Sequence, residues 1–208
     1  MDIAFKPTDL VLEIGCGEKP VRHDGLWHTL DSRKLDTVDI VADVNEALPV
    51  ADEKYDGVYA SFLMEHIRLP KLRGFVGEVY RILKPGGVAI IITSNLYEQA
   101  RVLIEKEEKG EVNDDIIHMI FGGKPDFEEN FHHSSLTPKF AIQLFREAGF
   151  YSLTIYEHPV AKQIWGKSTD FILEARKSGA RIARIERITS AGRTVPLSNT
   201  QGADPGHY

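Results

Sequence analysis

Short apolar runs alternate with helical patterns along most of the chain. Seven runs rich in β-branched and aromatic residues predict strands, at residues 10–14, 26–31, 37–43, 55–61, 88–94, 151–157 and 170–176. The run at 88–94, VAIIITS, is the most apolar of the seven. No internal repeat interrupts this series, so each run is expected to form a separate strand.

Helical patterns separate several of these strands. Apolar residues at helical spacing within 70–83 predict a helix, which the sequence KPGG ends. Its buried face is predicted to contain Leu72, Phe75, Val76, Val79 and Leu83. Residues 96–109 and 112–120 have weaker, more exposed helical patterns, and Thr137 can cap a helix that begins at Pro138. This alternation predicts an α/β fold, a doubly wound and mostly parallel sheet.

Length and charge narrow the possible classes of protein. The 208 residues are enough for one domain with a sizeable core, and the net charge of −6 gives no reason to expect nucleic acid as a partner. A single cysteine fits a reducing compartment. The start of the chain lacks the pattern of a secretory signal, and no apolar run approaches the ~20 residues that span a bilayer. We therefore expect a cytoplasmic protein without a membrane partner.

The last part of the chain differs from the rest. Residues 1–176 are predicted to form the functional domain, and residues 177–208 a C-terminal extension. Its final segment, SNTQGADPGHY, is polar and is predicted to be disordered. The preceding sequence ARIARIERI is compatible with a short basic helix, an extra strand or a solvated extension.

The first predicted strand ends in two glycines around the cysteine. Gly15 and Gly17 allow unusual backbone dihedrals and the close approach of a ligand, although a simple turn has the same composition. Pro20 stands where the third glycine of a dinucleotide-binding fingerprint belongs, so that fingerprint is a poor match. Ligands of open parallel sheets bind at the carboxyl ends of the strands, which makes this turn a candidate binding site.

Polar residues also end the next three predicted strands. These residues are Asp31, Asp43 and Ser61, and each of them has an alternative role as a cap or loop residue. Because the carboxyl ends of parallel strands meet at one edge of a sheet, we expect the three side chains to lie near the glycine turn. Glu13, inside the first apolar run, is a further candidate.

These motifs together resemble those of the class I S-adenosylmethionine-dependent methyltransferases. VLEIGCG is similar to the first motif of that family, and EVYRILKPGGVAIIITSN to its helix, turn and fifth strand. The stretch from DIVADV to SFLMEHI and the sequence LFREAGF extend the resemblance over residues 8–176. The resemblance implies a Rossmann-like, seven-stranded sheet whose last strand is antiparallel. A narrower resemblance is to a bacterial group of methyltransferases associated with surface-polysaccharide or glycan assembly.

The resemblance also implies roles for single residues toward S-adenosylmethionine. Glu13 is expected near the ammonium group, Asp31 at the ribose hydroxyls, and Asp43 at the adenine amino group. The implied cofactor-binding set comprises Glu13, Gly15, Cys16, Gly17, Asp31, Asp43, Val44, Ser61 and Phe62. One departure stands out, because only about ten residues separate Gly17 from the second strand. The first helix of the family is therefore expected to be short or missing.

Three histidines are candidates for a general base. A hydroxyl acceptor must lose its proton during methyl transfer, and an imidazole titrates in the right range. His66 follows the fourth predicted strand, and His132 with His133 precedes the last long helix. A structural role is the alternative for each of them. No metal site is predicted.

The leading hypothesis is a methyltransferase acting on a small polar acceptor, such as a sugar or a glycan intermediate. A non-catalytic cofactor-binding subunit and a nicotinamide-dependent oxidoreductase are the alternatives. An N-methyltransferase of nucleic-acid bases is disfavoured, because SFLMEHI replaces the Asp/Asn-Pro-Pro-aromatic motif of those enzymes.

Overall fold

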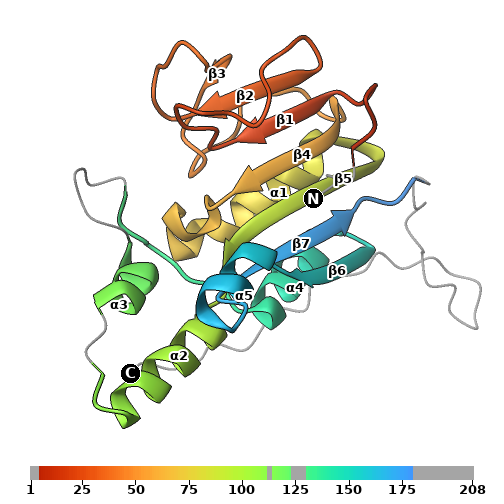
Figure 1. Cartoon of the computed structure of the whole chain (residues 1–208). Helices are drawn as coiled ribbons and strands as arrows, with labels where there is room; N and C mark the ends of the chain where they lie inside the picture. Colours follow the sequence, from red (N-terminus) through yellow and green to blue (C-terminus); the bar gives the residue numbers. More distant parts are fainter. Residues whose placement is uncertain (1–4, 112–113, 123–129, 180–208) are drawn as a thin grey trace, which may run out of the picture.

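A mixed seven-stranded sheet forms the centre of the molecule (Figure 1). The computed structural model describes residues 5–111, 114–122 and 130–179. The strand order is β3-β2-β1-β4-β5-β7-β6, and β7 runs antiparallel to both of its neighbours. The predicted Rossmann-like sheet with an antiparallel last strand is therefore confirmed. The strands are β1 (Val11–Ile14), β2 (Trp27–Asp31), β3 (Ile40–Val41), β4 (Tyr55–Ser61), β5 (Leu83–Ser94), β6 (Ser152–Glu157) and β7 (Asp170–Arg176).

The helices lie between strands or beyond their carboxyl ends. They are α1 (Leu72–Ile82), α2 (Leu96–Glu108), α3 (Asp114–Phe121), α4 (Pro138–Glu147) and α5 (Pro159–Trp165), with short 3-10 turns at Met64–His66 and Leu69–Lys71. The four predicted helices correspond to α1 to α4. The α5 helix was not predicted, although His158 caps it by accepting a hydrogen bond from the amide of Ala161 and Pro159 opens it.

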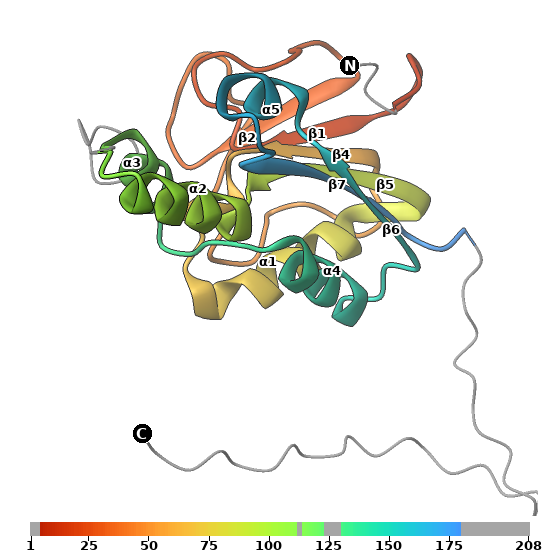
Figure 2. The same ribbon diagram turned by 60° about the horizontal axis from the view of Figure 1, so that its bottom comes forward.

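The two faces of the sheet carry different layers. Figure 2 shows α1 and α4 side by side on one face and α5 on the other. Phe75, Val76 and Val79 of α1 pack with Leu144 and Phe145 of α4 against the strands in the main hydrophobic core. The helix pattern therefore assigned the buried face of α1 correctly. Leu83 is also buried, but it lies in β5 rather than at the end of the helix.

A smaller apolar cluster lies on the opposite face. It comprises Val11, Trp27, Tyr59, Val88, Ile90, Ile92 and Ile172, with Phe5 packed against it. The rings of Phe5 and Trp27 meet edge to face, with centroids 5.6 Å apart. No helix occurs in residues 15–26, all of which the structure describes, so the predicted loss of the first helix is confirmed. Loop residues and Phe5 thus cover part of the face of β1 and β2 that a first helix would otherwise cover.

Two predicted strand boundaries were wrong for local reasons. β3 has only two residues instead of seven. The Asp39 carboxylate accepts from the amide of Thr29, and the Thr29 hydroxyl accepts from the amide of Asp39, so side chains replace backbone pairing there. β5 begins at Leu83 instead of Val88, because Leu83 already pairs with Tyr55 and the following residues bulge from the ladder.

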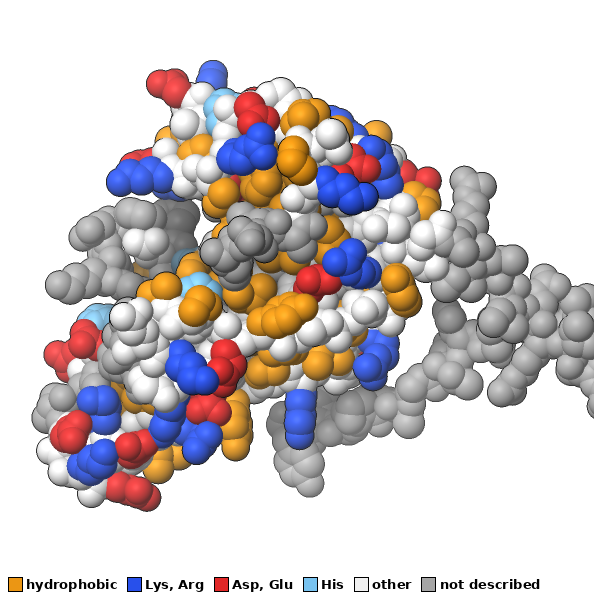
Figure 3. Space-filling model, turned by 45° about the vertical axis from the view of Figure 1, so that its right-hand side comes forward, with side chains coloured by type: hydrophobic (Ala, Val, Ile, Leu, Met, Phe, Trp, Pro, Cys, Tyr) orange, Lys and Arg blue, Asp and Glu red, His pale blue; other side chains and the backbone are white. Residues whose placement is uncertain are grey.

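Charged side chains of both signs intermix on the surface. In Figure 3, hydrophobic side chains gather in the middle of the view with positive and negative ones around them. Within the described ranges, no helix is both long and apolar enough to cross a membrane. The boundary between the predicted domain and the C-terminal extension stays a prediction, and the extension beyond residue 179 lies outside the described residues.

Candidate functional site

A cavity of about 460 Å³ lies at the carboxyl edge of β1, β2 and β3. This is the edge where the parallel strands of the sheet end, as predicted. Eight of its lining residues belong to the predicted cofactor or catalytic set: Gly15, Gly17, Asp31, Asp43, Val44, Phe62, His66 and His133. The structure therefore brings together residues from four strand ends that the sequence separates widely.

The glycine turn brings bare backbone to this cavity. Gly15 has φ +74° and Gly17 has φ +60°, a conformation that residues with a side chain rarely adopt. A Cβ atom at Gly15 would lie 2.9 Å from Cδ1 of Leu63. Both glycines therefore expose backbone where a side chain would close the space.

Asp31 holds this turn from the end of β2. Its carboxylate accepts a 2.9 Å hydrogen bond from the amide of Gly17 and bonds from the amide and Nε of Arg33, at 3.0 and 3.1 Å. Burial acts to raise the pKa of Asp31, but these hydrogen bonds outweigh it and lower the pKa below its ordinary value. Asp31 is thus ionised and fixes the turn, and its second partner, Arg33, is half-exposed at the cavity.

Asp43 and Val44 form the next part of the cavity wall. The Asp43 carboxylate accepts from the amide and the side-chain nitrogen of Asn45, at 2.8 and 2.9 Å, and these bonds lower its pKa. The amide of Val44 donates no hydrogen bond to the described residues. An ionised carboxylate beside a free backbone donor matches an adenine edge, which offers an amino donor and a ring-nitrogen acceptor. These residues therefore fit the group that the sequence predicts.

Three predicted cofactor residues do not line this cavity. The buried Glu13 carboxylate accepts bonds from the Trp27 indole and the amide of Val21, both at 2.9 Å. Cys16 is buried, and its burial raises the pKa of the thiol to about 11. Ser61 ends β4 without lining either cavity of the site. Glu13 and Cys16 thus act through the framework of the turn, with their side chains turned away from the cavity.

A second cavity, of about 280 Å³, adjoins the first. Its lining residues are Phe62, Glu65, His66, Ser94, Gln99, His118, Met119, His132 and Asp170. Phe62 and His66 line both cavities, so the two cavities meet at these side chains. Phe62 has φ +50°, which is rare for an aromatic residue and marks a strained turn at this junction.

The predicted histidines divide between the cavities. His66 and His132 stack edge to face at the second cavity, whereas the exposed His133 lines the first. The Nδ1 atoms of His66 and His132 lie 3.3 and 3.2 Å from the carbonyl oxygens of Phe131 and Ile120. Burial lowers the pKa of His132, which favours its neutral form. Two of the three candidate bases therefore share one small space.

The second cavity also contains two acids that the sequence did not single out as site residues. Glu65 accepts from the hydroxyls of Thr93 and Ser94, at 2.9 and 3.2 Å. Asp170 begins β7 and pairs with Ser94 across the sheet. Burial, reinforced by the charge of Glu65, raises the pKa of Asp170 to about 6. The first residue of an antiparallel strand lies at the same edge of the sheet as the last residues of the parallel strands. The sequence could therefore have indicated Asp170 as a site residue by its place at the start of the last strand.

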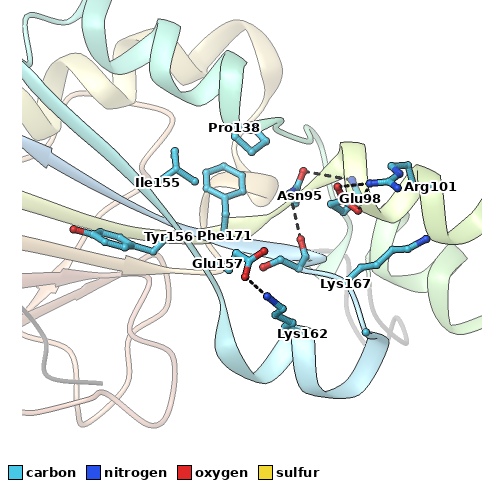
Figure 4. Close-up of a pocket in the computed structure, with 12 residues that line it drawn as sticks. Asn95, Glu98, Arg101, Pro138, Ile155, Tyr156, Glu157, Lys162, Lys167 and Phe171 are labelled. Carbon is cyan, nitrogen blue, oxygen red and sulfur yellow. Dashed lines mark hydrogen bonds and ion pairs between the residues drawn. The ribbon is translucent and has the colours of Figure 1, made fainter.

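A third cavity, of about 380 Å³, lies between the end of β6, α2 and α5 (Figure 4). Its cations are already paired, Arg101 with Glu98 and Lys162 with Glu157. Lys167 pairs with Glu105 of α2. Since each of these cations has an ionic partner, this cavity has fewer unpaired polar groups for a ligand than the other two. Among the residues that the structure describes, no group of His, Cys, Asp and Glu could hold a metal ion.

Comparisons with known proteins agree with this geometry. The family model described as a methyltransferase domain matches residues 25–91, from just before β2 into β5. This match covers less than half of the chain and indicates a methyltransferase domain over those residues. None of the curated proteins matches the chain by sequence. The residues around the first cavity fit S-adenosylmethionine, the cofactor that the sequence resemblance implies.

Solved structures with a similar fold include three methyltransferase systems. A chain of the complex between the Haloferax volcanii Trm112 methyltransferase activator and a candidate methyltransferase has a TM-score of 0.58 at 14% identity, covering 85% of this chain and 86% of that one. A SAM-dependent methyltransferase from Archaeoglobus fulgidus has a TM-score of 0.54 at 17% identity, covering 80% and 85%. The Burkholderia thailandensis 1,6-didemethyltoxoflavin-N1-methyltransferase, with bound 1,6-didemethyltoxoflavin and S-adenosylhomocysteine, has 0.52 at 14%, covering 82% and 71%. At these identities the likeness establishes the fold.

Proposed function

We propose that the protein transfers a methyl group from S-adenosylmethionine, held in the first cavity, to a small polar acceptor held in the second. The observation that carries this proposal is the junction of the two cavities at Phe62 and His66. A displacement at carbon needs donor and acceptor in line and in contact, so two adjoining cavities are the arrangement that it requires.

The cofactor supplies an electrophilic methyl group on a sulfonium when it is bound. Gly15 and Gly17 give it close access to the backbone, Asp43 and the amide of Val44 hold the adenine, and Asp31 orders the turn and reaches the ribose. Support comes from the free Val44 amide and the ionised state of both carboxylates. Glu13 acts on the cofactor only through the turn that it braces by its bond to Val21.

On the acceptor side, His66 or His132 removes a proton. A carbonyl oxygen can only accept a hydrogen bond, so Nδ1 of each ring carries a proton and Nε2 of the neutral ring has the free lone pair. His132 is the better desolvated of the two candidates, and His66 touches both cavities. His133 lies on the cofactor side and is exposed, which makes it the weakest of the three.

A sugar or glycan intermediate is the acceptor that the narrower sequence resemblance suggests. A cavity of about 280 Å³ lined by carboxylates, an amide and imidazoles suits a small molecule with several hydrogen-bond donors. We also propose a cytoplasmic enzyme, which the single cysteine supports.

Binding and turnover test this proposal separately. Calorimetry should show that the protein binds S-adenosylmethionine and S-adenosylhomocysteine but not a nicotinamide dinucleotide. Incubation with S-adenosylmethionine labelled on the methyl group and fractionated host extract, followed by mass spectrometry, should reveal a labelled small molecule. Tight cofactor binding without any labelled product would favour a non-catalytic subunit, and binding of the dinucleotide alone would favour an oxidoreductase.

A further inference from the structure

We propose that the second cavity recognises a protonated amino group, so that the acceptor is a small amine-bearing molecule. This inference rests on the proposed function, because it names the class of acceptor for the same site. It depends on the charges and unpartnered polar groups of the cavity wall, whereas the proposed function depends on the adjoining cofactor cavity. The two can therefore fail independently.

The wall of the cavity has unmatched negative charge. Glu65 is 1% exposed and Asp170 is 9% exposed, and both residues line the cavity. Neither a lysine nor an arginine occurs among its described lining residues. Among the described residues, the carboxylate of Glu65 receives hydrogen bonds only from the hydroxyls of Thr93 and Ser94, and none donates to the carboxylate of Asp170. Buried carboxylates without a cationic partner are costly, so a cation that enters this space gains free energy.

The third acceptor in the wall is an amide. Gln99 of α2 is 1% exposed, and its carbonyl oxygen Oε1 has no hydrogen-bond partner among the residues that the structure describes. Buried polar atoms of folded proteins are nearly always paired, so an unpaired acceptor that lines a cavity indicates a ligand with a donor. Glu65, Gln99 and Asp170 come from three separate segments, and all three residues line the same cavity.

An ammonium group matches this wall better than a set of hydroxyls does. An ammonium has three N–H donors and no acceptor, and it carries the charge that the two carboxylates lack. A sugar hydroxyl both donates and accepts hydrogen bonds. Three acceptors in the wall give it nothing to accept from. Phe62 adds an aromatic ring at the mouth of the cavity, and aromatic faces attract cations. An amino sugar would satisfy both this inference and the narrower sequence resemblance.

Matched pairs of ligands test the inference on the intact wild-type chain saturated with S-adenosylhomocysteine. The pairs are glucosamine with glucose, cyclohexylamine with cyclohexanol, and benzylamine with benzyl alcohol, and calorimetry measures the affinity of each compound. We expect the ammonium member of at least one pair to bind about tenfold more tightly than its hydroxyl partner, because only the ammonium gains from the buried charges. Equal affinities in all three pairs, or no binding of any amine at millimolar concentration, would overturn the inference.

Two variants locate the preference in this cavity. Asp170→Asn keeps the shape of the side chain and removes one charge, and Gln99→Leu removes the unpaired acceptor. Each should reduce the preference for the ammonium member severalfold while the affinity for S-adenosylhomocysteine stays the same. Glu157→Gln is the matched control, because Glu157 lines the third cavity and pairs with Lys162. If Glu157→Gln reduces the preference as much as Asp170→Asn does, the preference is general surface attraction. Loss of cofactor binding in the wild type would refute the proposed function instead.

Discussion

The imidazole rings of His66 and His132 meet edge to face, with centroids 5.0 Å apart and planes at 84°. Each ring uses Nδ1 toward a backbone carbonyl, which leaves Nε2 as the only nitrogen that can take a proton from an acceptor. A hydroxyl or ammonium acceptor must lose a proton before or during the attack on the methyl carbon. We therefore propose that the pair supplies a base for that step, with His66 at the junction of the two cavities and His132 in the second.

The first prediction concerns this base. His66→Gln should lower turnover by ~10²–10⁴-fold, the usual contribution of a general base, while the affinity for S-adenosylmethionine barely changes. Turnover with the labelled cofactor and calorimetry measure the two effects. His133→Gln is the comparison, because His133 is exposed and lines only the cofactor cavity. If His66→Gln keeps near-normal turnover and His132→Gln does not, His132 is the base and His66 its support.

The pH dependence of turnover distinguishes the two histidines further. Burial lowers the pKa of His132 below its ordinary value of 6.5. A base acts only when it is neutral, so turnover that depends on His132 should rise through an apparent pKa below that value as the pH increases. The pH profile of His66→Gln combined with Asp170→Asn reports on His132 without the titration of His66 or of Asp170, whose pKa of about 6 belongs to the same cavity. A profile that rises only well above neutral pH would exclude His132 as the base.

The buried Asp170 carboxyl should make the free energy of unfolding depend on pH. The pKa of Asp170 is raised to about 6 from an ordinary 3.8, so the fold prefers the protonated carboxyl. The destabilisation is absent below the unfolded pKa, grows as the pH rises toward the folded pKa, and is complete above it. Asp170→Asn should therefore raise the free energy of unfolding by on the order of 1–3 kcal/mol near pH 8.

Urea denaturation of wild type and variant near pH 8 and near pH 4 measures this difference. The gain should shrink strongly at the lower pH, where the wild-type carboxyl is already neutral. Glu157→Gln serves as the control, because its exposed ion pair with Lys162 contributes only ~0–1 kcal/mol at either pH. An equal gain from Asp170→Asn at both pH values would show that packing rather than charge is responsible.

The cofactor acids give a third prediction. Asp43→Ala and Asp31→Ala should each weaken the binding of S-adenosylmethionine by about 1–3 kcal/mol, the usual loss when a hydrogen-bonding carboxylate is removed. Asp31→Ala should also lower thermal stability, because Gly17 and Arg33 lose their partner. Calorimetry and thermal unfolding separate the two effects, with the exposed Glu46→Gln as a control outside the cavity. Unchanged affinity in both variants would contradict their assignment to the cofactor.

The sequence predicted the edge of the sheet better than the direction of each side chain. Asp31 and Asp43 reach the cavity because parallel strands end together, which follows from strand order alone. Glu13 is also acidic, but alternation along β1 places it beside Trp27 on the face that lost its first helix. The sequence predicted that the first helix is short or missing. It did not predict that the Trp27 indole, rather than a ligand, donates a hydrogen bond to Glu13.

Sequence patterns predicted few of the residues that line the second cavity. Glu65, Gln99 and Asp170 come from the 3-10 turn after β4, from α2 and from β7, and only tertiary packing brings them together. His66 and His132 were found because histidine is rare and chemically distinctive. A glutamine on a helix and an aspartate at the start of a strand have many ordinary roles. Their importance lies in their burial and missing partners, which no spacing in the sequence reveals.

The contact between Gly15 and Leu63 gives the last prediction. An alanine at residue 15 would need φ +74°, and its Cβ would lie 2.9 Å from Cδ1 of Leu63. Left-handed backbone costs a residue with a side chain about 1–2 kcal/mol, and the crowding adds to that cost. Gly15→Ala should therefore lower the free energy of unfolding by roughly 1–3 kcal/mol, measured by urea denaturation. It should also weaken cofactor binding, because the turn shifts at the cavity wall.

Two further variants separate the causes of that loss. Gly25→Ala is the control, since no heavy atom lies within 4 Å of its added Cβ, and its effect should stay within about 0.5 kcal/mol. A Leu63→Ala background removes the contacts with Cδ1 and Cγ of Leu63 and keeps the 3.3 Å contact with Cβ and the backbone strain, so Gly15→Ala should cost less there than in the wild type. If Gly15→Ala costs no more than Gly25→Ala, the turn adapts freely to a side chain. The close approach of backbone to the cofactor would then no longer explain why glycine occupies residue 15.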